Sequence, residues 1–177
     1  MRPLLLASLA SALACCSCFA APAGAAAPEN PQIDYDGYAA LTLSLGDVRE
    51  AHRLPYDEFI ARARAEGAIL LDARSSLAFA AGHIEGAVNL PLPDFTDAAL
   101  AEALGPDKSR PIYIYCNNNF SDDRAPIVTK RAPLALNIAT FINLHGYGYT
   151  NVWELGGVLQ TAEVQWVAAN PLASGGG

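Results

Sequence analysis

The segment Pro111-Ile112-Tyr113-Ile114-Tyr115-Cys116 decides the fold. It is a short run of β-branched and aromatic residues, which favours a buried strand over a helix, and a cysteine stands at its end. A second apolar run, Ala68-Ile69-Leu70-Leu71-Asp72, ends on an acid. Helical patterns separate such runs, so the sequence predicts an α/β fold with a parallel sheet. In sheets of this kind, ligands bind beyond the carboxyl ends of the strands, which is the position of Cys116.

Working outward from these runs, short strands alternate with helices along the chain. We predict strands at 40–44, 68–72, 87–90, 111–115 and 151–155. We predict helices at 55–65, 76–81, 97–104, 134–145 and 158–168. The expected core is therefore a parallel sheet of about five strands with helices packed against it.

Length and charge limit the classes of function. The chain has 177 residues, which suffices for one domain and a targeting segment but not for two full domains. Its formal net charge is −7 and it has no block of basic residues. Electrostatics therefore give it no reason to bind nucleic acid or anionic lipid, and we expect no nucleic-acid partner. A local pocket can still bind a small anion.

Residues 1–27 have the pattern of a secretory signal peptide. Arg2 provides a positive start, an apolar run covers 4–13, and small residues precede Pro28. The apolar run is shorter than the roughly 18 residues that a spanning helix requires. We therefore expect cleavage after Ala25, no membrane span after processing, and a periplasmic or secreted protein. A retained membrane anchor is the alternative.

Cysteine positions agree with that division. Cys15, Cys16 and Cys18 lie in the leader, so cleavage leaves Cys116 alone in the mature chain. Such a cysteine forms no internal disulfide, and it is buried, reactive or paired with another molecule. The leader also loosely resembles a lipobox with Cys16 as the acylated residue, although Cys15 stands where Gly or Ala is usual. A lipoprotein attached through Cys16 is thus a second alternative.

The remaining boundaries follow from composition. We predict an extended lead-in at 28–39, one folded domain at 40–168 and a flexible tail at 169–177.

Four short stretches of sequence are informative because of their order and spacing along the chain. They are Leu71-Asp72-Ala73-Arg74, the stretch 79–91, the strand 112–116, and Gly146-Tyr147 followed by 151–157. Together they resemble the signatures of the rhodanese-like (sulfurtransferase) domain family. The resemblance implies a three-layer α/β/α fold with a central parallel sheet and spans about residues 54–168.

The resemblance also implies a chemistry for Cys116. It would accept a sulfane sulfur from a small sulfur-containing anion such as thiosulfate, hold it as a persulfide, and pass it to a thiol, to cyanide or to a protein acceptor. No cofactor and no metal are implied. Backbone N–H groups and a helix N-terminus beyond the strand would lower the pKa of the thiol. An inert core cysteine is the alternative.

The loop after Cys116 departs from the usual family pattern, Cys-x-x-Gly-x-Arg. No glycine is near, the first arginine is eight positions on, and the loop is longer than usual by about ten residues. The asparagines can replace glycine in an anion cradle, and the cations can attract an anion. The predicted substrate-binding residues are Asn117, Asn118, Asn119, Phe120, Arg124, Lys130 and Arg131. Alternatively, the loop is a lid or a partner-binding surface with solvated charges.

Asp72, Arg74 and His83 are predicted to organise loops rather than to contact substrate. The two charged residues leave the end of a buried strand, where a charge requires a partner. The family usually has a glutamate four residues before the Gly-His pair, and Ala78 stands there, so Arg74 needs another partner. No second His or Cys lies at metal-ligand spacing from His83, which makes it a structural turn residue.

Three functions remain open from the sequence. The first is sulfur transfer in the cell envelope. The second is a non-catalytic sensing or interaction module, which the altered loop and Ala78 favour. The third is a cysteine phosphatase or arsenate reductase, although Arg124 is too far from Cys116 for the usual phosphate cradle.

Overall fold

The computed structural model describes residues 30–65, 67–122 and 128–168. Its helices are α1 (Tyr35–Ser44), α2 (Gly46–Ala51), α3 (Tyr56–Ala63), α4 (Ser76–Ala81), α5 (Asp97–Leu104) and α6 (Leu136–Gly146). Its strands are β1 (Arg53–Leu54), β2 (Ile69–Asp72), β3 (Gly82–Ile84), β4 (Val88–Asn89), β5 (Ile112–Tyr115), β6 (Val152–Leu155) and β7 (Trp166–Ala168). Short 3₁₀ helices are η1 (Leu92–Asp94), η2 (Asn117–Asn119), η3 (Ala132–Leu134) and η4 (Thr161–Glu163).

Five parallel strands form the central sheet, in the order β1-β6-β5-β2-β4. β5 lies in the middle, and β2 and β5 are paired along their full length, from Ile69 opposite Ile112 to Asp72 opposite Tyr115. The predicted α/β class with a five-stranded parallel sheet is therefore confirmed. In the part of the chain that the structure describes, no helix is long and apolar enough to cross a membrane.

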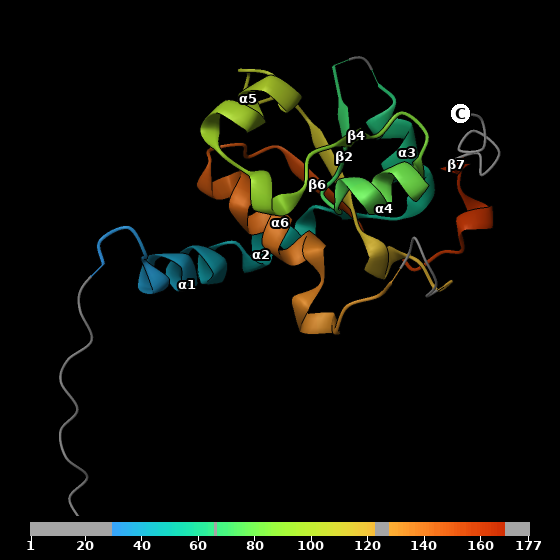
Figure 1. Cartoon of the computed structure of the whole chain (residues 1–177). Coiled ribbons are helices and arrows are strands. Elements are labelled where there is room, and N and C mark those ends of the chain that lie inside the picture. The colour runs from blue at the N-terminus through green and yellow to red at the C-terminus, as the bar shows by residue number, and fades with distance from the viewer. Residues whose placement is uncertain (1–29, 66, 123–127, 169–177) are drawn as a thin grey trace, which may run out of the picture. The chain divides into compact units, whose positions relative to one another are not determined.

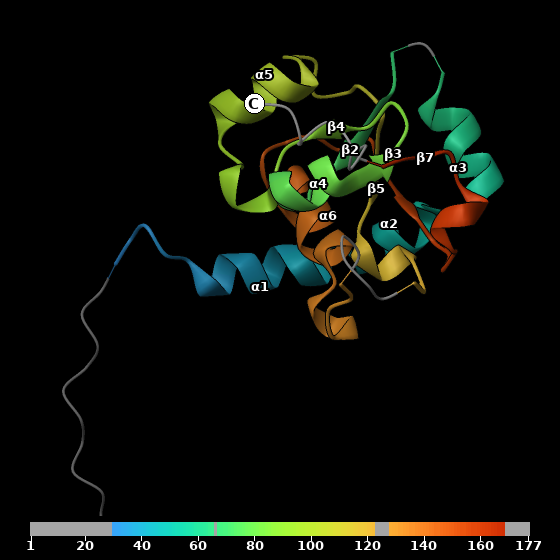
Figure 2. The same ribbon diagram turned by 45° about the vertical axis from the view of Figure 1, so that its right-hand side comes forward.

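Alternation along β5 divides the core into two layers. Ile112 and Ile114 face a cluster with residues of α5 and α6, whereas Tyr113 and Tyr115 face a cluster with residues of α3. Figures 1 and 2 show α6 and α3 on opposite sides of the strands. Because both faces are covered, β2 and β5 are apolar almost throughout, as parallel strands usually are. The three-layer arrangement is confirmed.

The strand predicted at 40–44 is wrong, since α1 covers this segment. The side chain of Asp34 accepts a hydrogen bond from the Gly37 N–H at 2.7 Å and so caps the helix, and Asp36 lies in the first turn. Alternation over five residues was too short a signal to outweigh this start. The first strand is instead β1, just after α2. α1 also crosses the predicted boundary at 39/40, although the domain limits themselves stay predictions.

The closing helix predicted at 158–168 is also wrong. The backbone of Leu159 is hydrogen bonded to the loop after Cys116: its N–H donates to the Asn119 carbonyl, and its carbonyl accepts from Ser121. η4 follows, and β7 then pairs antiparallel with β3, with His83 opposite Val167. The stretch 164–167 alternates between more and less buried residues, which suits a strand.

The other predicted elements are confirmed with small shifts of their ends. The predicted helices at 55–65 and 134–145 correspond to α3 and α6, and the predicted strands at 68–72 and 111–115 correspond to β2 and β5. The last predicted strand corresponds to β6. Differences of one or two residues at such ends are ordinary.

The β3–β7 pair depends on the missing side chain of Gly82. A Cβ there would lie 2.4 Å from Nε1 of Trp166. We expect Gly82→Ala to displace the indole ring and to lower the free energy of unfolding by about 1–3 kcal/mol in urea denaturation. Gly46→Ala is the matched control, because nothing lies within 4 Å of its Cβ position. Equal stability of the two variants would contradict this account of the pair.

Candidate active site

Strand ends meet at one edge of the sheet, and the sequence-predicted residues lie around it. Asp72 ends β2 and Tyr115 ends β5, and the two are register partners in neighbouring parallel strands. β6 lies on the other side of β5. Cys116 thus follows the central strand at the carboxyl edge of the sheet, which is where α/β folds bind ligands.

The sulfur of Cys116 is enclosed, and backbone N–H groups favour its charged form. The residue is 1% exposed. The N–H groups of Asn137, Asn118 and Leu136 act to lower the pKa of the thiol, and Leu136 and Asn137 belong to the first turn of α6. Such groups and the helix dipole favour a thiolate. Burial nevertheless raises the pKa of the thiol, because desolvation outweighs these N–H groups. The expected lowering of this pKa is therefore wrong, although the expected N–H groups are present.

Two of the three asparagines hold the loop together. Asn117 donates its side-chain amide to the Val128 carbonyl at 2.8 Å. Asn118 donates to the Lys130 carbonyl at 2.7 Å and accepts from the Lys130 N–H at 3.1 Å. These bonds fasten the returning segment 128–130 beside Cys116. The side-chain amide groups of Asn117 and Asn118 therefore donate within the loop and are not free to bind a substrate.

Asn119 joins three elements around the cysteine. Its Oδ1 accepts from the Cys116 N–H and from Nδ2 of Asn137, both at 2.9 Å. Its Nδ2 donates to the carbonyls of Leu155 at 2.8 Å and Gly157 at 3.0 Å. The buried side chain therefore ties the end of β5 to the start of α6 and the end of β6.

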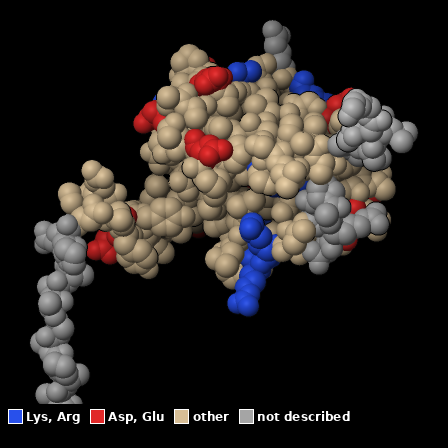
Figure 3. Space-filling view, viewed as in Figure 1, with Lys and Arg blue, Asp and Glu red and all other residues tan. Residues whose placement is uncertain are grey.

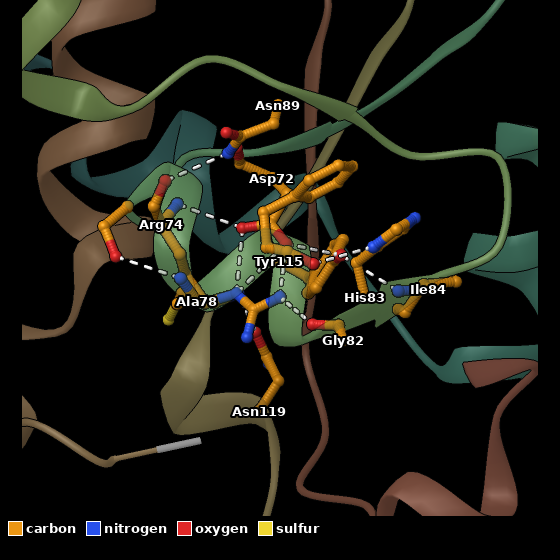
Figure 4. A network of polar contacts seen from close by, with 12 residues as sticks. Asp72, Arg74, Ala78, Gly82, His83, Ile84, Asn89, Tyr115 and Asn119 are labelled. Carbon is orange, nitrogen blue, oxygen red and sulfur yellow. Dashed lines mark hydrogen bonds and ion pairs between the residues drawn. The ribbon is translucent and has the colours of Figure 1, made fainter. Parts of the chain in front are cut away.

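A buried ion pair lies at the end of β2. Arg74 bonds to Asp72 through Nε and Nη2, with Nη2 2.6 Å from Oδ2, and both side chains are almost fully buried. The Tyr115 hydroxyl donates to Oδ2 of Asp72 at 2.7 Å and accepts from the Ile84 N–H at 3.1 Å (Figure 4). Burial lowers the pKa of Arg74, but the bonds and charge of Asp72 outweigh it and keep the guanidinium ionised. The arginine thus has the partner that it required.

His83 lies on the strand that leaves this network. Its ring stacks on Phe79, with ring centroids 3.7 Å apart, and its Nδ1 lies 2.9 Å from the Phe79 carbonyl. Arg74 Nη2 donates to the Gly82 carbonyl at 2.7 Å, and its Cζ lies 5.5 Å above the Trp166 ring. In the described residues, no three His, Cys, Asp or Glu side chains converge as metal ligands would.

A cavity of about 250 Å³ lies beside the cysteine loop. It is lined by Ala73, Arg74, Ser75, Ala78, Pro91, Pro93, Asn117, Lys130 and Leu136. Cys116 itself is not among the lining residues, although Asn117, which follows it in sequence, and Leu136, whose N–H acts on its sulfur, are. The cavity therefore lies next to residues that surround the sulfur, which is itself enclosed.

The remaining predicted residues are distributed unevenly. Phe120 is 1% exposed and packs edge-to-face against Tyr115 and Trp166, so it belongs to the core. Lys130 lines the cavity, whereas Arg131 is exposed and does not line it. Arg124 lies outside the described residues.

Comparison with known proteins settles the family. The profile of the rhodanese-like domain matches residues 55–160, more than half of the chain. The chain belongs to the rhodanese-like domain family. A comparison with curated proteins gives no significant match.

Solved structures similar to this rhodanese-like chain include rhodanese-like domains. The Alr3790 protein from Anabaena sp. is 25% identical, with 56% of this chain and 68% of that chain covered and a TM-score of 0.38. The solution structure of the rhodanese-like domain of the same protein is 21% identical, with 71% and 86% covered and a TM-score of 0.44. The BH2092 protein from Bacillus halodurans is 20% identical, with 73% and 77% covered and a TM-score of 0.39.

Four residues of this rhodanese-like site were not predicted from the sequence. Tyr115, Trp166, Asn137 and Glu154 all take part in the contacts around Arg74 or Cys116. A signal existed for two of them, since Asn137 and Glu154 interrupt apolar runs in a helix and a strand. A buried polar residue in such a run requires a partner, and both partners lie near the cysteine.

The ion pair at the end of β2 gives a stability prediction. We expect Asp72→Asn to lower the free energy of unfolding by about 3–5 kcal/mol, because it leaves the buried guanidinium without a counter-charge. Tyr115→Phe should cost about 1–3 kcal/mol, because two buried groups lose their partner. Chemical denaturation measures both.

The neighbouring aromatic of β5 supplies the control. Tyr113→Phe should change stability by no more than about 0.5 kcal/mol, since its ring keeps its contact with Phe59. If Tyr115→Phe lowers the free energy of unfolding no more than Tyr113→Phe does, the hydrogen bonds of the Tyr115 hydroxyl do not stabilise the end of β2.

Burial of the sulfur gives a pH prediction. A thiol with a raised pKa stays protonated at neutral pH, and only the thiolate is alkylated rapidly. We therefore expect the alkylation rate of the folded mature protein to increase with pH through a midpoint above that of N-acetylcysteine in the same buffer. A midpoint below that of the free thiol would show that the N–H groups dominate instead.

Proposed function

We propose that this rhodanese-like domain is a sulfurtransferase that uses Cys116 as its nucleophile. The thiol releases its proton to solvent, and the thiolate attacks the outer sulfur of a donor of the thiosulfate type. A new S–S bond forms to the cysteine, the S–S bond of the donor breaks, and sulfite leaves with the electron pair. A thiol, cyanide or protein acceptor then attacks the outer sulfur of the persulfide and restores the thiolate.

The observation that carries this proposal is the set of N–H groups around the sulfur. The N–H groups of Asn118, Leu136 and Asn137, at the carboxyl edge of the sheet, act to lower the pKa of the Cys116 thiol. Donors fixed in this way stabilise negative charge on the sulfur, both as thiolate and as persulfide, without needing to reorganise. An inert core cysteine has no need of several N–H partners.

The cavity beside the loop supports binding of an anion. Lys130 brings a positive charge to its lining, in a chain whose formal net charge is −7. Figure 3 shows a largely uncharged face with basic side chains over the segment before α6, where Lys130 and Arg131 are both exposed. A small anion would meet a locally positive entrance there.

A non-catalytic sensing or interaction module is the second candidate, and the burial of Cys116 favours it. At 1% exposure, the sulfur is reached only when the loop or the start of α6 moves. A module that recognises a partner through the loop has no such requirement. The two candidates differ in whether function depends on the sulfur, so a protein that keeps its biological role as Cys116→Ser is a module.

We also propose that the protein works in the cell envelope. The signal-peptide pattern of residues 1–27 supports export, and attachment through Cys16 remains the alternative form. Mass spectrometry of the mature protein purified from envelope fractions distinguishes a chain that begins after Ala25 from a lipidated one.

Sulfur loading tests the function directly. We expect the purified mature protein, incubated with thiosulfate and desalted, to gain one sulfur atom on the peptide that contains Cys116, as read by mass spectrometry. Added cyanide should remove this sulfur as thiocyanate. Cys116→Ser should gain none. Failure of the wild-type protein to gain sulfur from thiosulfate, from a thiosulfonate or from a persulfide donor would refute sulfur transfer.

Neighbouring cations in the loop give a matched pair of variants. Lys130 lines the cavity and Arg131 does not, so Lys130→Met should slow persulfide formation at low thiosulfate by about tenfold, and Arg131→Met should leave it nearly unchanged. High salt should reduce the difference, because it screens exposed charges. Equal rates of persulfide formation in the two variants would contradict binding of the anion in this cavity.

A further inference from the structure

An ion pair near the cysteine has one member in a segment that precedes the family match. Arg49 belongs to α2, whereas the match to the rhodanese-like domain begins at residue 55. Its Nη2 lies 2.6 Å from Oε1 of Glu154, a residue of β6. The Glu154 side chain is 6% exposed and that of Arg49 is 27% exposed. The segment before the domain thus supplies the counter-charge for a buried carboxylate.

That carboxylate connects to the cysteine through two amides. Oε1 of Glu154 accepts from Nδ2 of Asn137 at 3.3 Å, and the same nitrogen donates to Oδ1 of Asn119 at 2.9 Å. Oδ1 of Asn119 accepts the Cys116 N–H. The backbone N–H of Asn137 also acts to lower the pKa of the Cys116 thiol. Asn137 therefore contacts the ion pair with its side chain and acts on the sulfur with its backbone.

The pair has an unusual cost and an evident use. A buried carboxylate requires a partner, and an apolar side chain at position 154 of β6 would avoid this cost. Oε2 of Glu154 and Oδ1 of Asn137 are buried and lack a partner among the described residues. Polar groups kept at such a cost are more readily explained by the chemistry that they adjust than by stability.

We propose that Arg49 and Glu154 form a positioning pair, through which the α1–α2 segment sets the reactivity of Cys116. This deepens the proposed function and rests on Cys116 being its reacting residue. Glu154 holds Asn137, which orients the first turn of α6 on the sulfur, and its negative charge opposes ionisation of the thiol. Arg49 offsets that charge. A change that pulls Arg49 away would therefore make the sulfur less reactive.

Other charges near the sulfur do not perform this role. From β2, Asp72 and Arg74 neutralise each other in their own ion pair. From the returning loop, Lys130 borders the cavity. His52, which follows α2, has its pKa lowered by burial and by the charge of His145 at the end of α6, and it is neutral where a thiol ionises. Among the described residues, Glu154 is the charged group that opposes ionisation of the Cys116 thiol, in addition to the rise in pKa that burial causes.

The test uses alkylation of Cys116 in the mature protein, followed with iodoacetamide across pH. Glu154→Gln keeps the shape of the side chain and removes its charge, so the rate at pH 7 should rise on the order of tenfold and the midpoint should fall. Arg49→Met leaves the carboxylate unbalanced, so the rate should fall severalfold and the midpoint should rise. The double variant should follow Glu154→Gln.

A second, exposed ion pair provides matched controls. Arg53 of β1 and Glu50 of α2 lie 3.0 Å apart, with side chains 38% and 74% exposed. Glu50→Gln and Arg53→Met make the same changes of charge and should leave the alkylation profile as in the wild type. Profiles of Glu154→Gln or Arg49→Met that coincide with those of their controls would overturn the proposal.

Two further readouts keep the outcome clear. If Arg49→Met does not fold, as circular dichroism would show, Glu154→Gln against Glu50→Gln decides alone, and equal rates overturn the proposal. Sulfur loading is measured on the same samples. If the wild-type protein never gains sulfur but the Glu154 and Arg49 variants show the expected alkylation shifts, the proposed function is refuted and the positioning pair stands. If the wild-type protein gains sulfur but the variants show no shifts, the positioning pair is refuted and the proposed function stands.

Discussion

The hydrogen bonds of Asn119 are the constraint on which the site depends. A loop without glycine leaves the central strand at Cys116, and its backbone needs partners as it turns. The side chain of Asn119 satisfies the Cys116 N–H, the carbonyl of Leu155 at the end of β6 and that of Gly157 just after it, and it bonds to Asn137 of α6. One amide thereby fixes the ends of three elements around the sulfur.

Two opposing effects then set the state of the sulfur. Enclosure raises the pKa of the thiol, and the N–H groups of the first turn of α6 oppose that rise. At rest the balance favours a protonated, protected thiol. In the sulfur transfer that we propose, the same N–H groups stabilise negative charge on the sulfur, so protection and reactivity arise from one arrangement. A cysteine in the cell envelope, where we propose that the protein works, benefits from this protection against oxidants.

Much of this arrangement follows from local sequence, and the rest does not. The apolar runs at β2 and β5 and the order of the four signatures were sufficient to predict the sheet, its parallel strands and the location of Cys116. The elements at the two ends of the described chain, α1 and β7, were harder to predict. A helix cap at Asp34 and the pairing of β7 with β3 depend on contacts that alternation over a few residues does not reveal.

Within the site, residue types were easier to predict than their partners. The strand end and the family resemblance together predicted Cys116 as the reacting residue. Asn117 and Asn118, by contrast, bond to Val128 and Lys130, eleven and twelve residues further along the chain. The direction of the pKa shift of Cys116 was predicted wrongly because burial depends on the whole fold.

Amide nitrogen NMR of the folded protein measures the central contact, between the N–H groups and the sulfur, most directly. As pH rises through ionisation of the thiol, the amide signals of Asn118, Leu136 and Asn137 should shift together with one midpoint, and that midpoint should be absent from Cys116→Ser. Amides that stay constant across that range would contradict the claim that they face the sulfur.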